Sequence, residues 1–183
     1  MSKRKVRGYG KRIDAAAVVK GIIFSLMLVV CAPLQVSFFK VFGVVPAVVL
    51  SFVCAIGFVC GEMLGGICGI IGGTFLDIIG SEGISLSPLL FMLAGFFCGY
   101  LLKIFLRKNL VSFMVYSAAV GAARACITLG YFALKASSFS IIDIFTGTIF
   151  PELAAFILLA PVSYFLCTGI SRLTDRICGG HKK

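Results

Sequence analysis

The sequence predicts an all-α membrane protein, a polytopic bundle of six transmembrane helices, and three observations support this fold class. Hydrophobic residues make up 60% of the 183 positions, more than a soluble domain of this length can bury. The charged residues gather in short basic clusters. Between these clusters the chain has apolar stretches of about 20 residues, the length that crosses a hydrocarbon core of roughly 30 Å.

Six such stretches follow one another and form a single domain. We predict transmembrane helices near residues 18–39, 43–60, 64–80, 86–106, 110–134 and 146–170. The sequence "CGEMLGG" leaves the boundary between the second and third spans open. The transmembrane domain at 18–170 then lies between two basic tails, residues 1–17 and 171–183.

The first span follows the basic sequence "SKRKVRGYGKR", as the apolar region of a signal peptide would. Its apolar run is longer than usual for a signal peptide, and no small-x-small cleavage site follows it. Val30 also stands where a lipoprotein signal has a small residue, directly before Cys31. We therefore interpret this span as a transmembrane helix.

The third span carries glycines on one side. At about 100° per residue, a single arc of about 120° contains Gly65, Gly69, Gly72, Gly73 and Gly80. Asp77 falls at the edge of the same arc. Because close contact between glycine-lined backbones is a main way for helices to associate in a bilayer, we predict a helix-packing face here. Its partner is either another helix of this chain or a helix of another protein.

The connections after the third and fifth spans carry turn and helix-start signals. Glu82 and Gly83 are expected in a short external turn, and Ser87-Pro88 suits the first turn of the fourth span. Residues 137–152 are predicted to form an interfacial helix, ahead of a sixth span that Pro151 begins.

Three charged residues fall inside or at the ends of apolar spans. Asp77 and Glu152 lie toward the outer side, and Arg124 lies about 15 Å from the outer end of the fifth span. Charges inside a membrane usually face the bundle interior and pair with one another. We predict an intramembrane charge cluster of these three residues, in which Arg124 is the partner of Asp77. The alternative is that each side chain extends separately to the interface.

The distribution of basic residues predicts the orientation. With the N-terminus inside, all 17 Lys and Arg except Lys40, Arg124 and Lys135 fall on the cytoplasmic side. Six spans then return the C-terminus to the cytoplasm. The basic ends are expected to set this topology and to contact membrane lipids with anionic headgroups rather than nucleic acid, since no folded basic domain with base-stacking aromatics is present.

Catalytic, metal and cofactor functions are not predicted. The eight cysteines contain no CxxC pair, and all except Cys178 lie in or beside apolar spans, where they act as small packing residues. His181 is the only histidine, and the sequence has no phosphate-binding loop, nucleophile elbow or zinc-protease motif. We expect no enzymatic activity, no metal and no cofactor.

A small-residue pattern occurs twice, as "GFVCGEML" at 57–64 and "GFFCGYLL" at 95–102. Both copies would lie at the cytoplasmic ends of their spans. They are either a remnant of internal duplication or a coincidence in a chain rich in glycine and apolar residues.

The stretch "GVVPAVVLSFVCAIGFVCGEMLGGICGIIGGTFLDIIGSEGISLSPLLFMLAGFFCGYL" resembles the MreD family of the bacterial rod-shape and cell-wall elongation machinery. The resemblance lies in the order of the elements. Pro46 opens the second span, the Gly-rich third span ends in "DIIGSEG", and the next carries "AGFFCGYL". Family members often have an acidic residue where this chain has Ala47, so no role for that acid carries over.

The resemblance implies a non-enzymatic scaffold of the bacterial cytoplasmic membrane that helps to position peptidoglycan synthesis and so supports cell shape and cell wall biogenesis. The implied partners are MreC, RodA with its transpeptidase partner, and MreB on the cytoplasmic side. The alternative is the substrate-binding subunit of an energy-coupling-factor vitamin transporter, a small six-helix protein to which the MreD family is similar in structure. A transporter subunit needs a polar cavity open to the outside, which Asp77, Arg124 and Glu152 would line.

Overall fold

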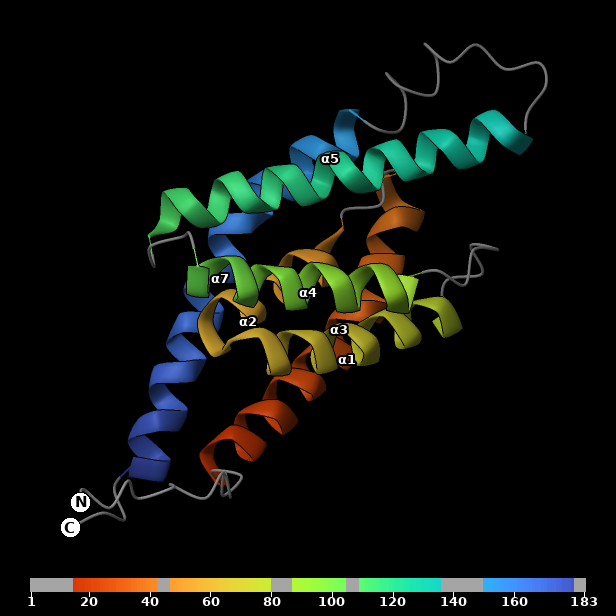
Figure 1. Cartoon of the computed structure of the whole chain (residues 1–183). Helices are drawn as coiled ribbons and strands as arrows, with labels where there is room; N and C mark the ends of the chain where they lie inside the picture. Colours follow the sequence, from red (N-terminus) through yellow and green to blue (C-terminus); the bar gives the residue numbers. More distant parts are fainter. Residues whose placement is uncertain (1–14, 43–46, 80–86, 105–108, 136–149, 180–183) are drawn as a thin grey trace, which may run out of the picture.

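The computed structural model of the chain describes residues 15–42, 47–79, 87–104, 109–135 and 150–179. These residues form six helices, which Figure 1 shows in chain order: α1 (Ala15–Phe42), α2 (Val48–Cys60), α3 (Glu62–Ile79), α4 (Ser87–Ile104), α5 (Leu110–Lys135) and α7 (Phe150–Gly179). Five of them are long and apolar enough to cross a membrane. The all-α, polytopic fold class predicted from the sequence is confirmed.

The exception in length is α2, which has 13 residues and extends about 20 Å. We expected a span at 43–60, of which 43–46 lie outside the described residues. The helix is apolar throughout, and residues 49–58 are all buried. Because neighbouring helices cover this segment, its length need not match the thickness of the bilayer.

The core of the molecule is built around α2, which packs against α1, α3, α4 and α7. Near its end, the ring of Phe58 contacts the rings of Phe113 from α5 and Tyr164 from α7, with centroids 5.4 and 5.8 Å apart. All six helices of the described residues contribute side chains to this one apolar core.

Buried polar groups fix the position of α2. The Gln35 side chain of α1 accepts a hydrogen bond from the Val49 backbone N–H, at 3.0 Å between Oε1 and N. This N–H belongs to the first turn of α2, where no backbone acceptor is available within the helix. Farther along, the hydroxyls of Ser51 and Ser163 are hydrogen-bonded at 2.8 Å and join α2 to α7.

The boundary that the sequence left open is a one-residue turn at Gly61. Its φ of 98° lies in the left-handed region that favours glycine. Its N–H donates to the Gly57 carbonyl at 3.0 Å, and α3 begins at the next residue, Glu62. The chain therefore reverses between α2 and α3 without a loop.

Ion pairs link helix ends on one side of the bundle. Lys20 of α1 pairs with Asp175 of α7 at 2.7 Å, and Lys103 of α4 pairs with Glu62 of α3 at 3.3 Å. In Figure 1 the start of α1 and the end of α7 lie on the same side of the molecule as the start of α3 and the end of α4. Because α7 continues to Gly179, residues 171–179, which we expected to begin the C-terminal tail, are helical.

Candidate functional site

Two features of the structure involve α4, a close backbone contact on one side and a cleft with polar groups on the other. One is the contact between α3 and α4, which we call the glycine seam and which is made by Gly65, Gly69 and Gly73 of α3 against α4. The other is a cleft between α4 and α5 that ends at Arg124. Together they place α4 between α3 and α5 (Figure 1).

In the glycine seam, three glycines spaced four residues apart bring two backbones into contact. A Cβ atom at Gly65 would lie 2.6 Å from the Gly95 carbonyl oxygen, and one at Gly73 would lie 2.5 Å from Pro88 Cα. A Cβ atom at Gly69 would meet the Phe91 carbonyl group. No side chain fits at these positions, so the seam requires glycine for close approach.

One end of the seam is a crossing of three backbones, at Gly57 of α2, Gly65 of α3 and Gly95 of α4. A Cβ atom at Gly65 would lie 2.6 Å from Gly57 Cα, and one at Gly57 would meet the Gly95 carbonyl oxygen. Gly57 and Gly95 are the first residues of the two similar patterns "GFVCGEML" and "GFFCGYLL". The repeated pattern therefore has a packing role, because its two copies contact each other.

Gly72 faces a different neighbour. A Cβ atom there would lie 3.0 Å from Val49 Cγ1 of α2 and 3.4 Å from Leu28 Cδ1 of α1. The glycine arc predicted from the sequence thus packs against α4 on one edge and against α1 and α2 on the other. Helices of this chain fill this part of the arc, and Gly80 lies outside the described residues, as do Glu82 and Gly83 of the predicted turn.

The structure brings together two of the three charged residues of the predicted cluster. Arg124 Nε and Glu152 Oε1 are 3.1 Å apart, with 21% and 17% of their side chains exposed. Asp77 takes no part in this pair, and its Oδ2 is buried with no hydrogen-bond partner among the described residues. The predicted contact between Asp77 and Arg124 is absent from the described part of the chain because α4 lies between α3 and α5.

The structure also gives the level of Arg124 relative to the neighbouring helices. It lines the same cleft as Ser87, the first residue of α4, and it pairs with Glu152, the third residue of α7. Arg124 therefore lies level with the starts of two helices, although α5 continues for about 16 Å beyond it. Figure 1 shows the reason, since α5 extends past the neighbouring ends of α4 and α7.

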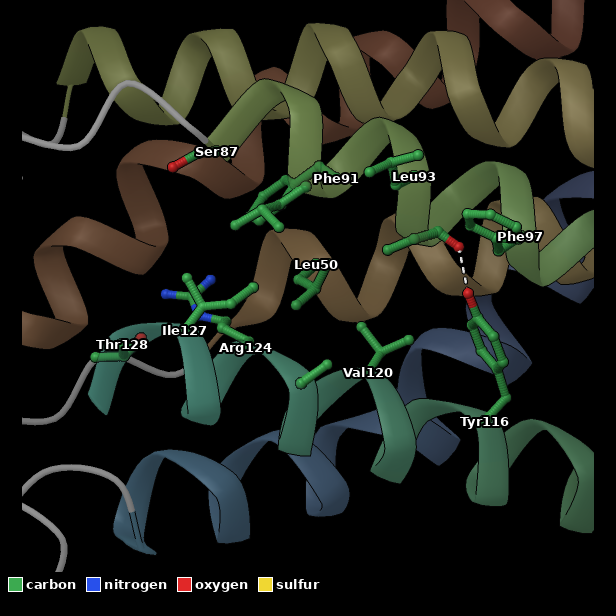
Figure 2. A pocket seen from close by; sticks show the side chains of 13 residues that line it. Leu50, Ser87, Phe91, Leu93, Phe97, Tyr116, Val120, Arg124, Ile127 and Thr128 are labelled. Carbon is green, nitrogen blue, oxygen red and sulfur yellow. Dashed lines mark hydrogen bonds between the residues drawn. The ribbon is translucent and has the colours of Figure 1, made fainter. Parts of the chain in front are cut away.

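The cleft between α4 and α5 has a volume of about 250 Å³. Its walls are apolar and come from three helices, including Phe91, Leu93 and Phe97 of α4, Val120 and Ile127 of α5, and Leu50 of α2. Figure 2 shows Arg124, Ser87 and Thr128 at one end of the cleft and Tyr116 at the other. The Tyr116 hydroxyl donates to the Ala94 carbonyl at 2.6 Å and so joins the two helices there (Figure 2).

Our reading of the sequence missed two polar residues that organise this region, Gln35 and Tyr116. An amide in the middle of an apolar span is costly unless it is paired, so the position of Gln35 could have predicted a buried hydrogen bond. The role of Tyr116 could not have been predicted in this way, because aromatic residues are common throughout the chain. The start of α4 at Ser87-Pro88 was predicted and is confirmed.

Comparisons of the chain with protein-family models, with curated proteins and with solved structures find no match.

Proposed function

We propose that the chain is a non-enzymatic integral membrane scaffold of the MreD kind, which helps to position peptidoglycan synthesis through helix–helix contacts. One observation carries this proposal. The stretch that resembles MreD contains α2, α3 and α4, and their backbones meet at Gly57, Gly65 and Gly95. Such a packed unit has no room to rearrange, so it can hold the surrounding helices at fixed positions.

The partners follow from the resemblance. MreC and RodA with its transpeptidase partner would contact the scaffold within the membrane, and MreB would act on the cytoplasmic side. Support comes from the exposed apolar residues of α1, among them Ile22, Leu26 and Val30. In a membrane, such a face is available to lipid or to another helix.

A cross-linking pull-down tests this function. A photo-reactive residue at Leu26 of α1 would be compared with one at Leu158 of α7, which is exposed on a different helix. The proposal expects MreC or RodA among the cross-linked proteins, and loss of rod shape when the chain is depleted. Recovery of a transporter ATPase with its membrane coupling subunit, together with unchanged cell shape, would contradict it.

The cleft between α4 and α5 favours a second candidate, the substrate-binding subunit of an energy-coupling-factor transporter. Such a subunit needs a polar cavity, for which the sequence suggested Asp77, Arg124 and Glu152 as lining residues. Of these three, only Arg124 lines the cleft. Its apolar walls fit a polar vitamin poorly, because few groups are placed to hydrogen-bond it. A saturable rise in melting temperature with one water-soluble vitamin, and loss of that rise on Arg124→Gln, would favour the transporter.

A further inference from the structure

We propose that the cleft between α4 and α5 binds one bilayer lipid with an anionic phosphate headgroup. One acyl chain lies between the two helices, and the headgroup phosphate lies against Arg124. This binding does not depend on which proteins the chain assembles with.

The shape of the cleft suits part of a lipid better than a whole soluble ligand. Its volume of about 250 Å³ lies below the roughly 300–1,000 Å³ of sites that enclose drug-sized molecules. Several lining side chains are also exposed at its margin, with 37% of Leu93, 48% of Phe97 and 42% of Ile127 accessible. In a membrane these side chains face the hydrocarbon, so an acyl chain can enter from the side.

The polar end of the cleft offers donors for a phosphate group. Arg124 uses Nε to pair with Glu152. Figure 2 shows its two terminal nitrogens directed toward the end of the cleft where Ser87 and Thr128 lie. A guanidinium group has five N–H donors, so it can bind a second acceptor beside the first, and phosphate fits its planar edge. The hydroxyls of Ser87 and Thr128 supply further donors.

The charge balance selects an anionic headgroup. The Arg124–Glu152 pair is neutral as a unit, yet Glu152 does not line the cleft and instead lines a small neighbouring cavity together with Arg124. The first turn of α4, which begins at Ser87, adds the positive end of a helix dipole. A phosphate in the cleft therefore meets donors and positive potential rather than the carboxylate.

The level of Arg124 agrees with the depth of a headgroup. The 18 residues of α4 extend about 27 Å, close to the thickness of the hydrocarbon core. Ser87, at the start of α4, is then at the boundary of the bilayer, and Arg124 lies level with it. An acyl chain extending from this point follows the apolar walls toward Tyr116.

Native mass spectrometry of the delipidated full chain tests the proposal. The probes are phosphatidylglycerol and phosphatidylcholine with identical acyl chains. We expect one tightly retained phosphatidylglycerol and about tenfold weaker retention of phosphatidylcholine, the loss expected when a charge-assisted contact is missing. Equal retention of the two lipids would overturn the assignment of the headgroup.

Two variants locate the lipid. Arg124→Gln removes the charge, and Ala123→Phe fills the cleft while keeping Arg124, so the second variant still tests the proposal if the first does not fold. Each is expected to weaken phosphatidylglycerol retention about tenfold. Their matched controls are Lys103→Gln, at the opposite end of α4, and Ala154→Phe, on an exposed face of α7, and both should retain the lipid.

Competition with inorganic phosphate distinguishes a lipid site from a simple anion site. Millimolar phosphate should leave the bound phosphatidylglycerol in place, because the acyl chain contributes most of the contact. Displacement by phosphate would overturn the proposal, as would undiminished lipid retention by a folded Ala123→Phe variant.

Discussion

A methyl group at Gly95 has no room, because its Cβ would meet the Gly65 carbonyl of the facing helix. We predict that Gly95→Ala lowers the free energy of unfolding by about 1–3 kcal/mol, the cost of overpacking, although alanine favours helix more than glycine does. Gly130→Ala is the matched control, since nothing lies within 4 Å of a Cβ atom there. Thermal unfolding in detergent measures both variants. A Gly95→Ala variant as stable as Gly130→Ala would mean that the seam is looser than described.

The ion pair of Arg124 with Glu152 is expected to couple these residues energetically, and Asp77 is expected to be independent of them. A double-mutant cycle of Arg124→Gln with Glu152→Gln should give a coupling free energy of about 0.5–3 kcal/mol. The same cycle with Asp77→Asn in place of Glu152→Gln should give a value near zero. A large coupling between Asp77 and Arg124 would restore the pairing that the sequence suggested.

At the scale of the helices, the first turn of α2 depends on a side chain of α1 for a hydrogen bond. We predict that Gln35→Met removes the acceptor of the Val49 N–H and speeds its exchange with solvent deuterium, at a cost of about 0.5–2 kcal/mol in stability. Hydrogen–deuterium exchange of α2 measures the effect. Amides in the second turn, whose acceptors lie within α2, serve as the internal control. If the first turn exchanges as slowly as in the parent protein, Gln35 does not hold the start of α2.

The helices could be predicted from the sequence because their signals are local. Which helices lie side by side could not be predicted. Apolar length marks the five long helices, and Ser87-Pro88 marks the start of α4. In a bilayer, however, apolar surface does not drive helices together, so apolar residues give no information about which helices are adjacent. The sequence therefore could not show that α4 separates Asp77 from Arg124, or that the short α2 is the centre of the bundle.

For the whole molecule, the ends of the helical bundle constrain its topology. Lys20 near the start of α1 pairs with Asp175 near the end of α7, so these two ends lie on one side of the molecule. Together with the basic residues near both termini, this arrangement predicts that both termini are cytoplasmic.

Reporter fusions test this topology. We predict that green fluorescent protein fused after Lys183 is fluorescent, and that alkaline phosphatase at the same position is inactive, since the first folds in the cytoplasm and the second requires export. Phosphatase inserted after Glu82, in the predicted external turn, should be active in the same cells. An active phosphatase after Lys183 would place the Lys20–Asp175 pair at the outer surface. The anionic lipid proposed at Arg124 would then belong to the cytoplasmic leaflet, because Arg124 of α5 pairs with Glu152, which lies at the opposite end of α7 from Asp175.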